Sequence, residues 1–297
     1  MYFYIHRLPP PHTHETMTVY VFGVSGMLGN YLRETLNTNG IRVVGFTRDR
    51  YDIAECSYQT LYELFETHAI VENDVVVNCA GIIPQKNTDK KLFYVVNAVF
   101  PILLSCVANV RRVKLVHITT DCVYDGRVGQ YTEHDPHTEQ GDYGLSKSLG
   151  ENIQATIIRT SIIGHERYGK KSLLEWVLSD HSSTGNVIQG YTHHRWNGLT
   201  CLELSRFITH IIRNDLLWSG VRHIFSDTVS KYELLCMIRD TYGLHTLTIQ
   251  PCVTASVDKS LRSVYASTVE SFGYEIPPLA TQVRELYTHH INDIRPI

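Results

Sequence analysis

The first 165 residues alternate between short apolar runs and segments whose apolar residues recur at helical spacing. Apolar runs of this length are typical of strands that are buried on both faces of a parallel sheet. We predict such strands at 18–22, 41–46, 74–78, 115–119 and 156–160. We predict helices from the segment after the first strand to about residue 37, and over 61–68, 92–110 and 143–153. Strands that alternate with helices in this way predict an α/β fold with a doubly wound parallel sheet.

The pattern loosens after Gly164. Pro101 is expected to kink the helix that contains it or to mark an irregularity there. The elements expected in the second half are helices at 171–178, 202–213, 231–242 and 281–289, strands at 222–225 and 247–250, and a polar, aromatic loop at 191–198. We predict one domain over 17–165, with returning segments near 199–226, and a smaller α/β domain over 166–297. Residues 1–16, with three consecutive prolines, are expected to be a flexible extension and not a signal peptide.

Composition argues against several classes of function. The chain has 297 residues, 43% of them hydrophobic, and a net charge of −3, so it lacks the basic excess typical of nucleic-acid binding. No apolar run is expected to cross a membrane. The seven cysteines form no C-x-x-C pair and are expected to be free thiols in the cytoplasm. The sixteen histidines form no convincing zinc site, so we predict no metal. Separately, we expect the protein to be a homodimer.

A glycine-rich segment joins the first strand to the first helix. It is Gly-Val-Ser-Gly-Met-Leu-Gly over residues 23–29. Between a strand and a helix, such glycines allow a tight turn, a close approach of the backbone to a pyrophosphate, and packing of helix on strand. The helix N-terminus adds N–H groups and the positive end of its dipole. The residues expected to bind a dinucleotide here are Gly23, Ser25, Gly26, Met27, Leu28 and Gly29.

The residues after the second strand indicate which dinucleotide binds. An acid there often holds the ribose 2′-hydroxyl of NAD(H), whereas an arginine accommodates the 2′-phosphate of NADP(H). The sequence is Thr-Arg-Asp-Arg over 47–50, so Arg48, assisted by Arg50, favours NADP(H). The alternative is that both arginines are solvated loop charges. Asp52 and Ile53 follow and are expected beside the adenine.

Small and polar residues follow the third strand. Asn78 is followed by Cys79, Ala80 and Gly81, past which a cofactor can run closely. Asn97 stands among apolar residues in the next helix. Ligands of doubly wound folds bind beyond the carboxyl ends of the strands, where these segments are expected to meet.

The segment 119–147 carries the candidate chemistry. Tyr143 and Lys147 are four residues apart and therefore share one face of a helix. A free phenol has a pKa of about 10, and a nearby ammonium lowers that value. Thr120, at the end of the neighbouring strand, could hold a substrate oxygen against the phenol. Alone, such a Tyr–Lys pair is usually only a helix face, but the neighbouring motifs favour a proton-donating site.

Together these motifs resemble the extended short-chain dehydrogenase/reductases. The stretch Thr-Thr-Asp-Cys-Val-Tyr-Asp-Gly from residue 119, with Tyr-Gly-Leu-Ser-Lys-Ser-Leu-Gly-Glu from residue 143, is similar to the dTDP-4-dehydrorhamnose reductases. The resemblance covers residues 18–165 well and weakens after them. It implies a Rossmann domain that binds NADP(H), and a substrate domain. It also implies reduction at C4 of a nucleotide-linked 4-keto-6-deoxy sugar, giving an activated sugar like L-rhamnose or N-acetylated rhamnosamine.

The resemblance also implies roles for single residues. Tyr143 would protonate the C4 oxygen, and Thr120 would hydrogen-bond to the same oxygen. Lys147 would lower the pKa of Tyr143 and hold the nicotinamide ribose, and Asn97 would support the proton relay.

One departure from the family concerns Cys122, where the rhamnose reductases usually carry tyrosine. GDP-fucose synthases and plant-type rhamnose synthases, which also epimerise, carry cysteine there. A thiol near a 4-keto sugar can remove the proton at C3 or C5. A basic residue after the last Rossmann strand then reprotonates the other face, and Lys171, next to Lys170, is the candidate. The alternative is that Cys122 is a small buried filler and that the lysines are solvated.

The C-terminal part also departs from the family. Rhamnose reductases carry an Arg-Pro-rich segment near the nucleotide phosphates, whereas this chain offers Lys259 and Arg262. Further candidates for the sugar-nucleotide pocket are Arg195, Trp196 and Asn197.

Two rival functions stay open. A regulatory subunit of methionine adenosyltransferase shares the fold, binds NADP and acts by contacting its catalytic partner, but it has no need of a poised donor such as Tyr143. A 4-epimerase or dehydratase would keep NAD bound, and dehydratases usually carry an acidic pair after the threonine. Here Asp121 is followed by Cys122, and Arg48 favours a dissociable NADPH.

Overall fold

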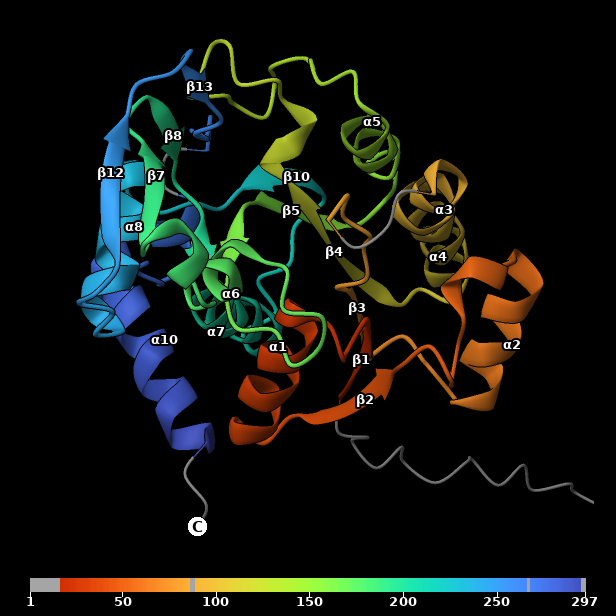
Figure 1. The fold of residues 1–297 in the computed structure, drawn as a ribbon. Coiled ribbons are helices and arrows are strands. Elements are labelled where there is room, and N and C mark those ends of the chain that lie inside the picture. Colours follow the sequence, from red (N-terminus) through yellow and green to blue (C-terminus); the bar gives the residue numbers. More distant parts are fainter. Residues whose placement is uncertain (1–16, 86–88, 266–267, 295–297) are drawn as a thin grey trace, which may run out of the picture.

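The computed structural model describes residues 17–85, 89–265 and 268–294, and a parallel sheet forms its centre (Figure 1). In spatial order its six strands are β10 (Gly220–His223), β5 (Thr156–Thr160), β4 (Lys114–Thr120), β3 (Val75–Asn78), β1 (Thr18–Phe22) and β2 (Arg42–Phe46). All neighbouring strands pair in parallel. The chain runs outward from β1 in both directions, so β1 is the switch point at which such folds bind ligands. The predicted doubly wound parallel sheet is confirmed.

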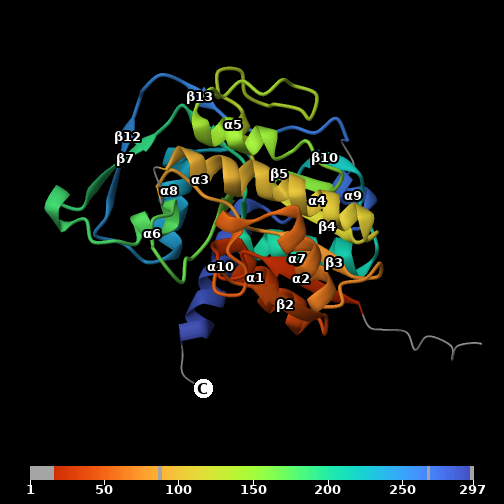
Figure 2. The same ribbon diagram turned by 90° about the vertical axis from the view of Figure 1, so that its right-hand side faces the viewer.

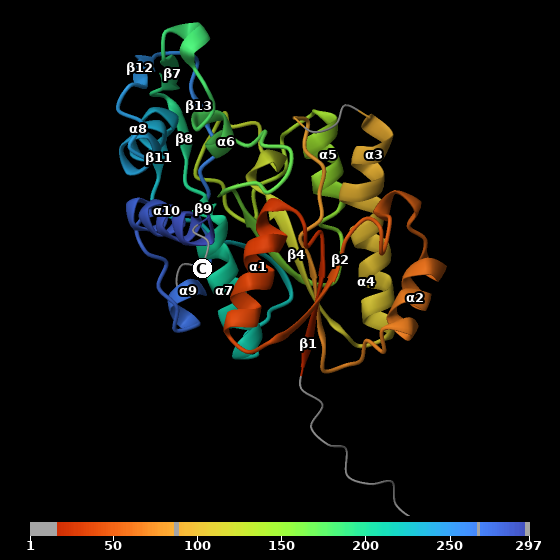
Figure 3. The same cartoon turned by 60° about the horizontal axis from the view of Figure 1, so that its bottom comes forward.

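Helices cover both faces of this sheet (Figure 3). The helices on one face are α1 (Met27–Thr38) and α7 (Cys201–Arg213), and those on the other include α2 (Tyr58–Thr67) and α4 (Phe100–Val110). Alternate residues of a strand point to opposite faces, so β1 contributes Val19 to the first core and Tyr20 to the second. Helix α2 begins three residues before its predicted start because Ser57 caps it through a capping box with Thr60.

The predicted helix over 92–110 is one continuous helical segment with an irregular middle. It consists of α3 (Lys90–Tyr94), a π-helical turn (Val95–Val99) and α4. Pro101 has no N–H to donate to the carbonyl of Asn97 four residues earlier, which accounts for the widened turn. Figure 2 looks onto this segment, with α5 (Asp142–Leu149) lying along it.

The same segment shows that the expectation of no apolar run long enough to cross a membrane is wrong. Lys90–Val110 is long and apolar enough to cross a membrane by length and composition alone. However, 56% of its most apolar stretch is buried inside the fold. Phe100, Leu104 and Val107 pack in the second core, so the apolar character of the segment is that of a core helix.

The remaining elements form a smaller α/β region beside the sheet. Its strands are β6 (Ile162–Ile163) paired with β9 (Leu199–Thr200), β7 (Val187–Tyr191) paired with β12 (Thr248–Cys252), and β8 (His194–Trp196) between β11 (Val229–Ser230) and β13 (Val257–Asp258). Its helices are α6 (Leu173–Val177), α8 (Lys231–Thr241), α9 (Thr268–Ser271) and α10 (Leu279–Ile294). All seven cysteines are free, as expected.

Two predictions about single elements are wrong. The segment 191–198 is not a loop, because His194–Trp196 pairs with strands from distant parts of the chain. The helix expected over 143–153 ends at Leu149, and Gly150 follows it. A Cβ at Gly150 would lie 2.0 Å from the carbonyl oxygen of Asn97, so only glycine lets α5 approach the π-helical turn this closely.

Candidate active site

The glycine-rich segment forms a tight loop against the carboxyl end of β3. Gly23 has a φ of +74°, and a Cβ at this position would lie 2.8 Å from Ala80. A Cβ at Gly29 would lie 2.2 Å from the carbonyl oxygen of Gly23. Gly26 precedes α1 and offers no side chain to its first N–H groups. The loop is therefore a cradle of backbone in front of an open helix N-terminus, which fits the pyrophosphate of a dinucleotide.

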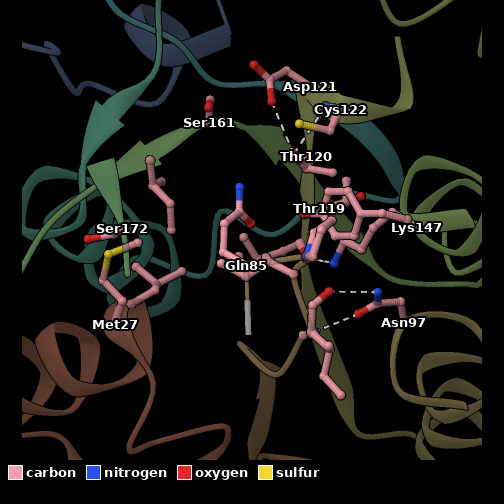
Figure 4. A pocket seen from close by; sticks show the side chains of 18 of the residues that line it. Met27, Gln85, Asn97, Thr119, Thr120, Asp121, Cys122, Lys147, Ser161 and Ser172 are labelled. Carbon is pink, nitrogen blue, oxygen red and sulfur yellow. Dashed lines mark hydrogen bonds between the residues drawn. The ribbon is translucent and has the colours of Figure 1, made fainter. Parts of the chain in front are cut away.

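A cavity of about 630 Å³ lies beside this cradle (Figure 4). It is lined by residues from the glycine loop, from the ends of β3, β4 and β5, from α5 and from the start of α6. The lining residues that the sequence predicted are Gly26, Met27, Leu28, Cys79, Ala80, Gly81, Asn97, Thr120, Cys122, Tyr143, Lys147, Lys171 and Lys259. The cofactor candidates and the catalytic candidates thus share one cavity.

Some of the cofactor candidates lie outside the cavity lining. Gly23, Ser25 and Gly29 belong to the same loop, with Ser25 exposed. Arg48 is exposed in the turn after β2. The Asp52 carboxylate accepts a hydrogen bond from the N–H of Ala54 at 3.0 Å and caps a short 3₁₀-helix that starts at Ile53.

The structure does not bring four of the substrate candidates into the cavity. The Trp196 indole is buried and donates to the Oγ of Ser161 at 2.8 Å. Asn197 is also buried, and its amide bonds to both the N–H and the carbonyl of Leu261. Arg195 faces Glu233 on the surface at 3.7 Å, and Arg262 is exposed. Trp196 therefore ties the smaller region to the end of β5, and Asn197 joins two segments within that region.

Thr120 and Tyr143 face each other across the end of β4. The Thr120 hydroxyl accepts a hydrogen bond from the N–H of Cys122 at 3.1 Å and lies 3.1 Å from the Asp121 carboxylate, to which it donates. The sequence suggested a lowered pKa for Tyr143. Burial instead raises the pKa of Tyr143, and this effect outweighs a hydrogen bond with Thr120 that lowers it. Tyr143 therefore keeps its proton at neutral pH and can act as a donor.

Lys147 reaches under the cavity from α5. Its side chain is buried, and Nζ donates to the carbonyl oxygen of Ile118 at 3.2 Å. Burial lowers the pKa of Lys147 to about 8, although the Glu151 carboxylate opposes this shift. The ammonium is thus only narrowly favoured near neutral pH.

Asn97 lines the cavity and also ties two segments of its wall together. It lies in the π-helical turn and is buried. Its Oδ1 accepts from the N–H of Ile82 at 3.0 Å, and its Nδ2 lies 3.0 Å from the Ile82 carbonyl and 3.2 Å from the Ser146 Oγ. The amide thus fastens the loop after β3 to α5, which fixes the cavity wall (Figure 4).

Cys122 and Lys171 both line the cavity. Burial and the neighbouring Asp121 carboxylate raise the pKa of Cys122 to about 12, so the expected lowering by a cation does not prevail. Lys171 lies two residues before the start of α6, and its N–H donates to a Glu166 carboxylate oxygen at 2.6 Å. The N–H of Ser172 donates to the same oxygen at 3.0 Å, so Glu166 holds this loop in place.

Sequence reasoning missed several charged groups near the cavity. Lys231, at the start of α8, lies with Nζ 5.0 Å from the centre of the Trp196 ring. Burial lowers the pKa of Lys231, while the nearby Asp121 and Cys122 raise it. Glu139 lines the cavity and pairs with Lys259 at 3.6 Å. No local motif marks Lys231 or Glu139, because only the tertiary fold brings them here.

Sequence comparison assigns the chain to a family. The family described as RmlD substrate binding domain matches residues 17–276. Because this match spans most of the chain, the protein belongs to that family, as the motifs suggested.

Several relatives with names that state a function are similar over most of the chain. A protein of Haloferax volcanii named a probable low-salt glycan biosynthesis reductase is 29% identical over 82% of this chain and 86% of its own. A spore coat polysaccharide biosynthesis protein of Bacillus subtilis is 26% identical over 84% of this chain and 87% of its own. The beta subunit of methionine adenosyltransferase 2 from Bos taurus is 24% identical over 80% of this chain and 76% of its own.

Solved structures show the same fold. A dTDP-4-dehydrorhamnose reductase of Clostridium acetobutylicum superposes with a TM-score of 0.78 and 21% identity, over 93% of this chain and all of that one. A dTDP-4-dehydrorhamnose reductase of Bacillus anthracis in complex with NADP superposes with a TM-score of 0.76 and 20% identity, over 92% of this chain and 99% of that one.

Proposed function

We propose that this protein is an NADPH-dependent reductase of a nucleotide-linked 4-keto-6-deoxy sugar, acting at C4. The observation that carries this proposal is that Thr120, Tyr143 and Lys147 line the same cavity as the glycine loop and the small residues after β3. A proton donor thus lies next to a dinucleotide cradle, which is the arrangement that carbonyl reduction requires. The names of the relatives, which include a reductase and polysaccharide biosynthesis, support the same reading.

Each residue contributes one part of the reaction. When bound, the coenzyme supplies hydride to the carbonyl carbon. Tyr143, which keeps its proton at neutral pH, gives that proton to the carbonyl oxygen. Thr120 turns its hydroxyl from Asp121 to the same oxygen and fixes its position. The Lys147 ammonium stabilises the phenolate that Tyr143 becomes.

The coenzyme and the substrate would occupy different halves of the cavity. Gly26, Met27 and Leu28, with the backbone after β3, would hold the pyrophosphate and nicotinamide half, and Arg48 would meet the 2′-phosphate. The basic residues Lys171 and Lys259 line the same cavity, and their charges suit the diphosphate of a nucleotide sugar. We place the enzyme in the cytoplasm, where its free thiols persist.

The direct test is turnover. Purified protein would be mixed with NADPH and UDP-, dTDP- or GDP-linked 4-keto-6-deoxy sugars, and products would be identified by mass and proton NMR. One of these substrates should oxidise NADPH stoichiometrically and yield the 4-hydroxy sugar. Absence of turnover with all of them, for a protein that binds NADPH, would contradict the proposal.

The similarity to the beta subunit of methionine adenosyltransferase 2 supports a second candidate, a non-catalytic NADP-binding subunit. This function predicts a complex with a methionine adenosyltransferase catalytic subunit, detectable by size-exclusion chromatography. It also predicts that Tyr143→Phe leaves complex formation unchanged, because the phenolic proton has no part in docking. Sugar-nucleotide turnover without such a complex favours the reductase.

A further inference from the structure

A buried ion pair lies beneath the cavity, between α5 and β5. Arg159 in β5 and Glu151, just after α5, are 2% and 9% exposed. Arg159 donates from Nε to Glu151 Oε1 at 3.2 Å and from Nη2 to Glu151 Oε2, so the pair is bidentate. Thr119 donates to Glu151 Oε1 at 2.7 Å. With both oxygens bonded to donors, Glu151 is held as a carboxylate in one orientation.

The side chains of Lys147 and Glu151 form hydrogen bonds with consecutive residues of strand β4, Ile118 and Thr119. They are four residues apart, Lys147 in the last turn of α5 and Glu151 just beyond its end, and both side chains reach β4. Lys147 Nζ reaches the carbonyl of Ile118, and the Glu151 carboxylate accepts from the hydroxyl of Thr119. The buried ammonium and the buried carboxylate are thus held at neighbouring positions of β4.

We propose that Glu151, fixed by Arg159, is a positioning residue of the active site that keeps the Lys147 ammonium charged. This inference rests on the role of Lys147 in the proposed function. Glu151 does not line the cavity, so it acts only through Lys147. Glu151 is the main influence that opposes the effect of burial on the Lys147 pKa.

The other titratable groups around Lys147 cannot replace Glu151. Cys79 and Cys122 raise the pKa of Lys147 only when they are thiolates. Burial raises the pKa of each thiol to about 12, so both are protonated at neutral pH. Tyr143 keeps its proton because burial raises its pKa. His117, on β4, is buried, and burial holds its pKa well below the ordinary value, so it is neutral. At neutral pH the negative charge facing Lys147 from the described elements is therefore that of Glu151.

The pH dependence of NADPH binding tests this proposal without any sugar substrate. The dissociation constant would be measured by NADPH fluorescence from pH 6 to 9.5 for the parent protein, Glu151→Gln and a matched control, Glu133→Gln. Glu133 is a carboxylate that accepts hydrogen bonds from the N–H of His223 and from the hydroxyl of Ser263. It contributes to the pKa of Arg159 but not to that of Lys147. NADPH binding by the parent protein should weaken above about pH 8, because Lys147 loses its charge there. This pH is the break in the binding curve.

We expect Glu151→Gln to move this break to lower pH by about one unit, which makes NADPH binding about fivefold weaker at pH 8. Glu133→Gln should keep the parent break, and Glu151→Asp should restore most of it. An unmoved break in folded Glu151→Gln overturns the inference, even where its melting temperature falls, since a merely structural residue changes stability alone. A parent curve with no break would overturn the role of Lys147 as well.

Glu151→Gln leaves Arg159 buried without its anion, and this variant could fail to fold. The double variant Glu151→Gln/Arg159→Met removes both charges and avoids this penalty. It should show the same shift of the break to lower pH, because Lys147 again lacks its anion. A double variant with the parent break overturns the inference.

Discussion

The hydroxyl of Thr120 lies 3.1 Å from the carboxylate of Asp121 and donates its hydrogen to it. Burial raises the pKa of Asp121, while Lys231 and Lys259 lower it, so two lysines support the carboxylate that accepts this hydrogen. A substrate carbonyl entering the cavity has to compete with Asp121 for the Thr120 hydrogen. Thr120 is thus held by a buried neighbour, and its hydrogen has to turn from Asp121 to reach the substrate oxygen.

Replacing Thr120 tests whether this hydroxyl acts on the substrate oxygen. Thr120→Val should lower kcat by about 10²–10³-fold, the usual effect of removing one positioned donor to a developing oxyanion. Thr120→Ser keeps the hydroxyl and should retain activity within about tenfold of the parent. Steady-state kinetics would measure both variants, and equal loss in the two would mean that the methyl group and not the hydroxyl matters.

Replacing Tyr143 tests the proton donor. Tyr143→Phe should lower the rate of reduction by about 10²–10⁴-fold, because general acid catalysis contributes on that scale. The dissociation constant of NADPH should stay near that of the parent, since the ring still fills its space. A loss smaller than tenfold would show that another group donates the proton.

Replacing Arg48 tests the preference for NADPH over NADH. Arg48 is exposed after β2, and loss of a charged contact to a 2′-phosphate should raise the KM for NADPH by about ten- to a hundredfold. The KM for NADH should change little in Arg48→Ala. Arg50→Ala is the matched control, because Arg50 already donates to the carbonyl of Gly45 at 3.3 Å. A parent protein that uses both coenzymes equally would contradict the prediction.

Much of the sheet could be predicted because its signals are local. β3 is a run of three valines that ends in Asn78, with every residue buried, and the glycine loop follows β1 directly, so periodicity and turn chemistry suffice. The meeting of Thr120, Tyr143 and Lys147 in one cavity follows from the rule that strand ends share an edge.

The rest depended on tertiary contacts that leave little trace in the sequence. β8 is a strand because distant residues pair with it, although its own composition resembles a loop. The pKa of Tyr143 could not be anticipated from its spacing to Lys147, because burial of the phenol dominates. Lys231 approaches Asp121 and Cys122 only through the packing of α8, and nothing around it in the sequence indicates this.

The Arg159 cluster predicts how stability depends on pH. Arg159 donates to the Nε2 atoms of His137 at 2.7 Å and His223 at 2.8 Å, which requires both imidazoles to be neutral. Burial lowers the pKa of both histidines below the ordinary value of about 6.5. The unfolded chain therefore binds more protons below that pH, so this contribution to stability is complete above about pH 6.5 and is lost as the pH falls.

Melting curves between pH 5 and 8 measure this effect. The melting temperature should fall below about pH 6.5, and the fall should be smaller in His137→Asn, which removes one of the two titrating groups. His134→Asn is the control, because His134 is exposed in the same segment. A His137→Asn curve parallel to that of the parent would show that other groups cause the acid sensitivity.

The last prediction concerns proton exchange on the sugar ring. Cys122 and Lys171 line the same cavity as Tyr143, which is the placement that epimerisation before reduction requires. Burial raises the pKa of Cys122 to about 12, so the thiolate that would remove a ring proton is scarce at pH 7. Exchange by this thiol should therefore be slow at neutral pH and rise about tenfold for each pH unit.

The measurement is incubation of the keto substrate in deuterated water without NADPH, at several pH values up to 9, followed by proton NMR. Deuterium should enter at C3, C5 or both, with a rate that increases with pH. Cys122→Ser should remove this pH-dependent exchange and still reduce the keto sugar, because Thr120, Tyr143 and Lys147 remain. Lys171→Met should slow epimerisation more than exchange, since it removes the group that returns the proton. If no deuterium enters at any pH, the protein is a plain 4-reductase and Cys122 is packing; if exchange persists in Cys122→Ser, another base removes the proton.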